Sequence, residues 1–207
     1  MLTDAQAARI GVDTSGGGAG DCSDGVLLTT RAGTTRYNFT FQESFVRPGT
    51  GYSNWASRTN YPALGVVQTG PHEMLLYVQR DYGQKTAYLE RMTLRLDGFA
   101  SVHAPYEGGR MLTKPLVFSG SRVENNYATS AAGGIRMAIQ GASGEPIPGF
   151  TLDECVENIG DEIKRVVRWR GGSDLSKLAG RPIRLELAMK DADLFSIRFG
   201  APAAGEK

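Results

Sequence analysis

Residues 74–98 read MLLYVQRDYGQKTAYLERMTLRLDG, and this stretch decides the fold class. It opens with a short apolar run at 74–80, which a polar turn at 81–84 separates from a second run at 86–96. An Asp-Gly dipeptide closes the stretch and favours a two-residue hairpin turn into a further strand over 99–104. Short strands joined by tight turns predict an antiparallel sheet.

The sequence before this stretch has the same character. Residues 25–31 and 35–41 predict a hairpin around Ala32-Gly33-Thr34, and residues 63–69 predict a strand that leads through Gly70-Pro71 into the next one. Four short antiparallel strands with tight turns are typical of one blade of a β-propeller.

Three parts follow from these patterns. Residues 1–24 are Gly-rich and aperiodic and predict a loose N-terminal arm. Residues 25–104 predict an antiparallel, blade-like propeller-end segment. Residues 105–207 predict a β-sandwich module of jelly-roll type, because apolar and polar residues alternate along its runs. The 27 glycines and 9 prolines agree with an all-β fold that has many turns.

Within the predicted sandwich, individual strands and turns can be assigned from local sequence. In the run IRLELAM, Ile183, Leu185 and Leu187 point to one side and the residues between them to the other. Residues 152–160 and 174–178 predict short helical turns.

Composition excludes several function classes. Lys and Arg number 23 against 22 Asp and Glu, so the net charge of +1 gives no basic footprint for nucleic acid and no polybasic membrane surface. No apolar run approaches the roughly 20 residues that span a bilayer. The N-terminus lacks an apolar signal segment, which leaves two localisations open: bacterial cytoplasm, or export as part of a longer parent.

The two cysteines, Cys22 and Cys155, are not spaced as a metal site, and no cofactor is expected. They are expected to be free thiols, or a disulfide if the protein is exported. Asp191 and Asp193 could hold Ca²⁺ with help from carbonyls, although a plain hairpin turn at 190–193 is the favoured interpretation. Trp169 is expected to anchor the core rather than to form a sugar platform.

Several collinear segments resemble a known family. They include NWASRTNYPALGVVQTG (54–70), LYVQRDYGQKTAYLERMTLRLDGF (76–99), NNYATSAAGGIRMAIQ (125–140) and GEPIPGFTLDEC (144–155). Together they resemble the last propeller segment and the closing β-sandwich module of bacterial proteins related to five-bladed-propeller glycosidases of the β-fructosidase type. The resemblance implies a carbohydrate-active, glycoside-hydrolase-like protein. The chain has room for one blade, so the family's catalytic carboxylates cannot be carried over to it.

The stretch RPGTGYSNWASRTNYPALG (47–65) is the candidate ligand site. The resemblance places it on the rim of the sugar-binding funnel, where aromatic rings cover the C–H side of a sugar and Arg or Asn bonds its hydroxyls. The candidate substrate-binding residues are Arg47, Trp55, Arg58, Asn60 and Tyr61. The alternative is a structural loop, in which Trp55 fills the base of a turn and Arg58 pairs with an acid.

Glu43 and Asp81 are the candidate catalytic carboxylates, because both lie at strand ends near loops that could face one pocket. Glycoside hydrolysis needs two carboxylates, about 5–5.5 or about 6.5–9.5 Å apart. The alternatives are an ion pair between Glu43 and Arg47 and a turn-capping role for Asp81.

Carbohydrate is the expected partner. The competing hypothesis is a non-catalytic interaction module, because a lone blade leaves unpaired edges and an uncovered apolar face that a homo-oligomer would hide.

Overall fold

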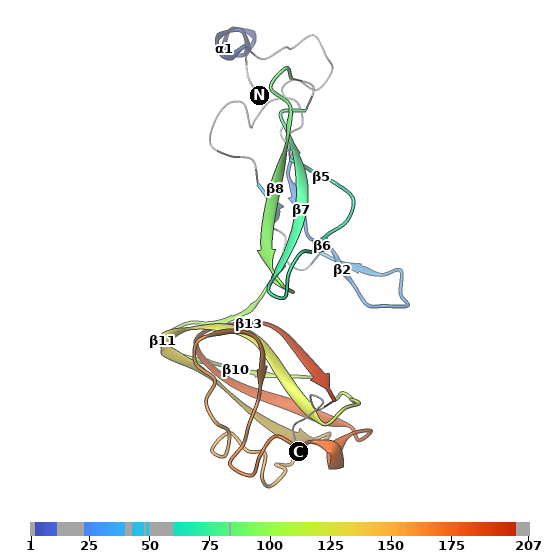
Figure 1. Cartoon of the computed structure of the whole chain (residues 1–207), viewed down its shortest axis with the longest axis vertical. Coiled ribbons are helices and arrows are strands. Elements are labelled where there is room, and N and C mark those ends of the chain that lie inside the picture. The colour runs from blue at the N-terminus through green and yellow to red at the C-terminus, as the bar shows by residue number, and fades with distance from the viewer. Residues whose placement is uncertain are drawn as a thin grey trace. The chain divides into compact units, whose positions relative to one another are not determined.

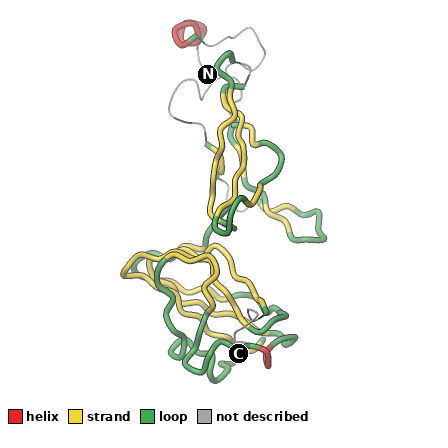
Figure 2. Tube along the Cα trace, viewed as in Figure 1, coloured by secondary structure: helices red, strands yellow, loops and turns green. Residues whose placement is uncertain are grey.

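The computed structural model describes residues 3–11, 23–39, 43–47, 49, 60–82 and 84–201. Within these ranges the chain is all-β, with antiparallel strands, one short α-helix and one 3₁₀ turn (Figures 1 and 2). No described helix is long and apolar enough to cross a membrane. The chain divides into two compact units, Met1–Leu96 and Asp97–Lys207.

The first unit begins with helix α1 (Asp4–Ile10), where the sequence predicted a loose arm. Thr3 caps the helix through a capping box: its hydroxyl accepts from the Gln6 amide, and the Gln6 side chain accepts from the Thr3 amide. Gly11, at φ 73°, ends the helix in the left-handed conformation that glycine adopts without strain. These local caps stabilise a helix too short for amphipathic periodicity to reveal.

The first unit is otherwise built from short strands around one long hairpin. The strands are β1 (Gly25–Val26), β2 (Thr29–Thr30), β3 (Tyr37–Asn38), β4 (Ser44–Val46), β5 (Tyr61–Pro62), β6 (Val67–Gln68), β7 (Glu73–Arg80) and β8 (Tyr88–Arg95). The central strand is β7, which pairs with all of β8 and, through its other edge, with β5 and β6. The two long green strands in Figure 1 are β7 and β8.

One face of this sheet carries the small core of the unit. Leu76 and Val78 of β7 pack with Val46 of β4, and all three are buried. Met92 and Leu94 of β8 lie against them. Because side chains alternate along a strand, Tyr77, which lies between Leu76 and Val78 in β7, points to the opposite face.

Two predictions for this unit need correction. The predicted strand over 63–69 is wrong for most of its length: only Val67–Gln68 forms β6, since Gly65 at φ 93° interrupts the extended backbone. The hairpin around Ala32-Gly33-Thr34 is confirmed between β2 and β3. Its strands are shorter than predicted, because residues 25–26 pair with β4 instead.

The second unit contains β9 (Val102–Ala104), β10 (Gly109–Leu112), β11 (Arg122–Gly141), β12 (Asp161–Val166), the 3₁₀ turn η2 (Ser176–Leu178) and β13 (Ile183–Gly200). Hydrogen bonds join its strands into one five-stranded sheet in the order β10-β13-β11-β12, with β9 also on β13. The long strands β11 and β13 form most of it. Their register shifts between Thr129 and Gly134, where residues 130–133 lie opposite Asp191.

Three predictions for this unit are wrong, and long-range pairing is the reason each time. β9 pairs with β13 rather than forming a hairpin with β8. Residues 190–193 lie inside β13 and not in a turn. Residues 152–160 are not helical, because Cys155 and Asn158 form bridges to Trp169 and Ile135.

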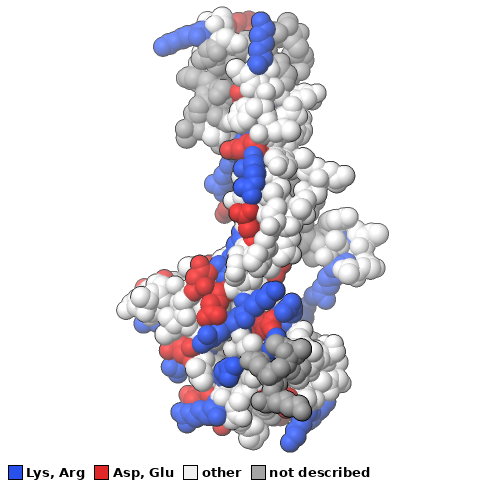
Figure 3. Space-filling model, viewed as in Figure 1, with Lys and Arg blue, Asp and Glu red and all other residues white. Residues whose placement is uncertain are grey.

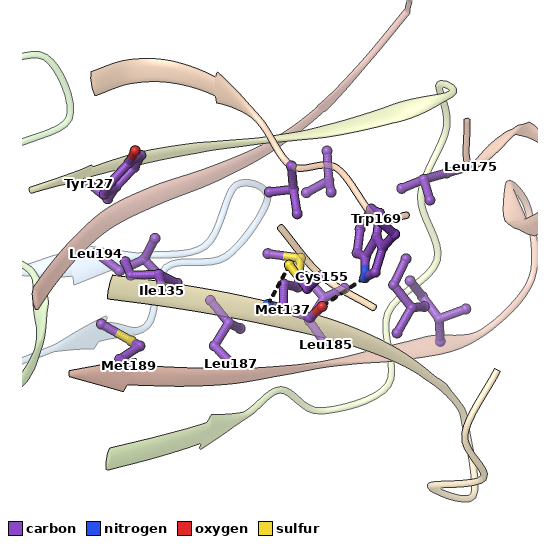
Figure 4. Packing of buried hydrophobic residues seen from close by; sticks show 14 of the residues in the cluster. Tyr127, Ile135, Met137, Cys155, Trp169, Leu175, Leu185, Leu187, Met189 and Leu194 are labelled. Atoms are coloured by element: carbon purple, nitrogen blue, oxygen red, sulfur yellow. Dashed lines mark hydrogen bonds between the residues drawn. The ribbon is translucent and has the colours of Figure 1, made fainter. Parts of the chain in front are cut away.

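The core of the second unit lies between the sheet and the loops that connect its strands (Figures 2 and 4). Ile183, Leu185 and Leu187 are buried, which confirms the alternation predicted for β13. Trp169 is 2% exposed and its indole N–H donates to the Met137 carbonyl at 2.9 Å, so its core role is confirmed. Burial raises the pKa of the neighbouring Cys155 thiol.

Candidate functional site

The pairing of β5 with β7 brings together residues from two of the predicted site segments. The Asn60 amide donates to the Gln79 carbonyl at 3.0 Å, and Tyr61 lies opposite Gln79 in the sheet. Asp81 and Tyr82 follow β7 directly in the chain. Asn60, Tyr61, Asp81 and Tyr82 therefore lie at the same end of the sheet.

Tyr61 and Tyr82 form an exposed aromatic pair, which we call the aromatic corner. Their ring centroids are 5.6 Å apart and the ring planes make an angle of 78°. Tyr61 is 42% and Tyr82 50% exposed, so both rings contact each other and still offer surface to solvent. An edge-to-face pair is a favourable arrangement for two aromatic rings, and it fixes the angle of the corner.

Asn60, the residue before Tyr61, is buried and hydrogen-bonded. It is 1% exposed, and its Nδ2 donates to the Ser23 carbonyl at 2.7 Å. Its backbone is left-handed at φ 76°, a conformation in which Asn is several-fold enriched among non-glycine residues. Asn60 was predicted to bind ligand, and in the structure its side chain is buried directly before Tyr61 in the chain.

Asp81 has the contacts of a turn-stabilising carboxylate. It is 8% exposed with φ 52°, and its Oδ2 accepts from the Thr86 hydroxyl at 2.9 Å. Its carbonyl accepts from the Gln84 amide at 3.0 Å. These hydrogen bonds stabilise the turn between β7 and β8, and Tyr82 is part of that turn.

Glu43 and Arg47 form an ion pair of 3.0 Å on the surface. Their side chains are 76% and 64% exposed, respectively. A pair this exposed contributes little stability, and it accounts for both charges without a ligand. The two remaining candidate residues, Trp55 and Arg58, lie outside the described residues, as does Cys22.

Sequence reasoning did not single out Tyr82. Its signal is an aromatic residue in a turn that otherwise consists of polar residues and glycine, DYGQ at 81–84. Only the pairing of β5 with β7 shows that this ring meets Tyr61.

Within the part of the chain that the structure describes, no cluster of three or more His, Cys, Asp or Glu side chains could hold a metal ion. Asp193, one of the two acids considered for Ca²⁺, accepts from the Ser101 hydroxyl at 2.7 Å and lies 3.2 Å from His103 Nδ1.

No family model, curated protein or solved structure matches this chain. The resemblance to propeller glycosidases therefore stays a prediction, and the function is argued from the geometry of the site.

Proposed function

We propose that this protein binds a poly- or oligosaccharide at the aromatic corner, as part of a glycoside-hydrolase-like system. The observation that carries the proposal is the exposed, perpendicular Tyr61–Tyr82 pair at 5.6 Å. Isolated exposed apolar residues are ordinary on a protein surface. Tyr61 and Tyr82 differ from such residues, because their rings pack against each other and the residue before each of them is a buried polar residue. Their binding surface is therefore already arranged before a ligand arrives.

The chemistry of the corner suits a sugar. A tyrosine ring offers a flat apolar face for the C–H side of a sugar, and its hydroxyl both donates and accepts hydrogen bonds. Tyrosine has only two side-chain torsions, so a ring that already packs on another loses little entropy on binding. Gln79, opposite Tyr61 and partly exposed, adds an amide that can donate to and accept from sugar hydroxyls.

Binding is proposed here without hydrolysis. The Glu43 carboxylate pairs with Arg47, and the Asp81 carboxylate accepts from Thr86, so each has a structural role. The proposal is therefore limited to binding and assigns neither carboxylate to the pair that hydrolysis requires.

Electrophoresis in gels that contain fructan, arabinan, xylan or β-glucan tests the proposal. We expect at least one polysaccharide to retard the wild-type protein, and Tyr61→Ala to weaken that binding about tenfold, which corresponds to about 1.4 kcal/mol. Tyr37→Ala is the matched control, because Tyr37 is a 66% exposed tyrosine of β3 in the same unit. Equal loss in both variants, or no retardation of the wild type, would contradict the proposal.

A second candidate is a structural module that associates through its exposed sheet. Leu64, Val67 and Leu89 are 106%, 58% and 65% exposed, and such apolar surface favours a partner. Sedimentation of the same variants separates the two candidates. Under this alternative, the wild-type protein sediments as an oligomer and none of the polysaccharides retards it.

A further inference from the structure

The outer face of β7 continues the surface of the aromatic corner. Tyr61 lies opposite Gln79, and the Ala63 amide donates to the Tyr77 carbonyl at 2.8 Å, so β5 and the residue after it run along β7. Gln79 and Tyr77 are two positions apart and therefore share a face. Tyr77 is 43% exposed on that face. We call Tyr82, Tyr61, Gln79 and Tyr77 the tyrosine strip.

The dimensions of the strip follow from strand geometry. Two residues of an antiparallel strand span about 6.8 Å, so Tyr77 lies one such step beyond Gln79. On the neighbouring strand β8, Leu89 stands opposite Gln79 and is 65% exposed. The strip is thus flanked by open surface and extends beyond the two rings of the corner.

The strip has little net charge. Arg91, opposite Tyr77 on β8, pairs with Glu73 at 2.8 Å, and the Thr69 hydroxyl donates to the same carboxylate at 2.8 Å. The Thr69 hydrogen bond, with Arg91 beside it, holds the pKa of Glu73 below its usual value. In Figure 3, charged side chains of both signs lie along β8, and the surface beside it over β5 and β6 carries few charges.

The other ion pair of this hairpin belongs to the opposite face. Arg80 pairs with Glu90 at 2.6 Å, and Glu90 stands opposite the buried Val78. Neither residue shares the face of Tyr77 and Gln79, because side chains alternate along both strands. Arg80 and Arg91 each have a carboxylate partner, so neither is a free cation for an acidic ligand on the strip.

We infer that the strip binds a neutral, soluble oligosaccharide that lies along β7, with one sugar ring in the aromatic corner and the following rings over Gln79 and Tyr77. This inference rests on the proposed function and names its ligand class. Ring planes at 78° cannot both lie on one flat face, so the corner receives a single chain rather than the surface of a crystalline polysaccharide.

Calorimetric titration with xylo-oligosaccharides and fructo-oligosaccharides of increasing length tests the inference. In at least one of the two series we expect the affinity of the wild-type protein to rise with chain length. Tyr77→Thr should weaken binding of the longer oligosaccharides about tenfold and leave binding of the shortest unchanged, while Tyr61→Ala weakens both. Oligogalacturonates of the same lengths, which carry a carboxylate on each ring, should bind more weakly than the neutral series.

Two controls separate loss of the ligand surface from loss of the fold. Tyr77→Phe keeps the ring and should retain most of the length dependence. Tyr37→Ala removes an exposed tyrosine elsewhere in the unit and should bind as the wild type does.

The outcomes distinguish this inference from the function on which it rests. If Tyr61→Ala abolishes binding and Tyr77→Thr changes nothing, the corner stands and the strip is refuted. Oligogalacturonates that bind more tightly than the neutral series would refute the neutral ligand class. If the wild type binds no saccharide at any length, both proposals are overturned.

Discussion

Two buried asparagines of the second unit, Asn125 and Asn158, differ in the hydrogen bonding of their side chains. Asn125 is 0% and Asn158 2% exposed. Neither side-chain polar atom of Asn125 has a hydrogen-bond partner among the described residues. The Asn158 amide donates to the Ile135 carbonyl at 3.4 Å, and its backbone bridges to the same residue. A buried amide without partners costs free energy that an apolar side chain of similar shape does not.

Asn125→Leu should therefore raise the free energy of unfolding by about 1–3 kcal/mol, because it removes an unsatisfied polar group from the core. The matched variant Asn158→Leu should lower that free energy by about 1 kcal/mol, because it removes a hydrogen bond. Urea unfolding followed by circular dichroism measures both. Destabilisation by Asn125→Leu would show that this amide is hydrogen-bonded in solution, by a buried water for instance.

At the residue scale, the candidate site was predicted from residues whose pattern also fits a turn. Asn60 and Asp81 attracted attention as polar residues at strand ends, a position that suits ligand binding and catalysis. In the structure both side chains are buried and both residues have a left-handed backbone. Each therefore turns the chain directly before one of the two tyrosines. Their sequence signal is the same as that of a turn, since Asn and Asp tolerate left-handed backbone.

At the scale of elements, the register shift in the β11–β13 pair depends on the absence of a side chain at Gly133. A Cβ atom on Gly133 would lie 2.5 Å from the Lys190 carbonyl oxygen, and it would also collide with the carbonyl of Asp191. Residues 130–133 lie opposite Asp191 at this point, where the strand register shifts. Such close backbone approach is a recognised use of glycine within a strand.

Gly133→Ala should lower the free energy of unfolding by about 1–3 kcal/mol, because the two strand backbones must move apart. Gly171→Ala is the control, because a Cβ there meets nothing within 4 Å and the backbone is not left-handed. The control should change stability by less than about 0.5 kcal/mol. Equal effects of the two substitutions in thermal unfolding would show that the close approach of the two backbones at the register shift is unimportant.

Elements differ in how well local pattern predicts them. The β7–β8 pair was predictable, because two runs of strand-forming residues and the polar turn between them lie within one short stretch. The expected helix at 152–160 fails since Cys155 and Asn158 bond to residues far away in the chain. No local periodicity encodes such a partner.

At the scale of the whole molecule, the buried apolar clusters of the two units differ greatly in size among the residues that the structure describes. The first unit buries Val46, Leu76 and Val78 as its apolar cluster. The second buries a much larger cluster drawn from the sheet and the connecting loops, with Trp169 and Tyr127 among its members. Burial of apolar surface is the dominant favourable term in folding, so the second unit should be the more stable.

Residues 97–207 expressed alone should therefore fold, and should unfold in urea in one cooperative transition. The full chain should show the same transition after an earlier one from the first unit. Circular dichroism of the fragment and of the full chain, at the same urea concentrations, measures this. A fragment that is unfolded without denaturant would show that the second unit needs the first.

The all-β class and the alternation of Ile183, Leu185 and Leu187 in β13 were determined by sequence alone. Each of these depends on periodicity within a few neighbouring residues. Only the tertiary structure decided that β9 belongs to the sheet of β13, and that Tyr61 meets Tyr82. Both depend on the register between separate segments, which is set by the burial of whole faces and not by any local run of residues.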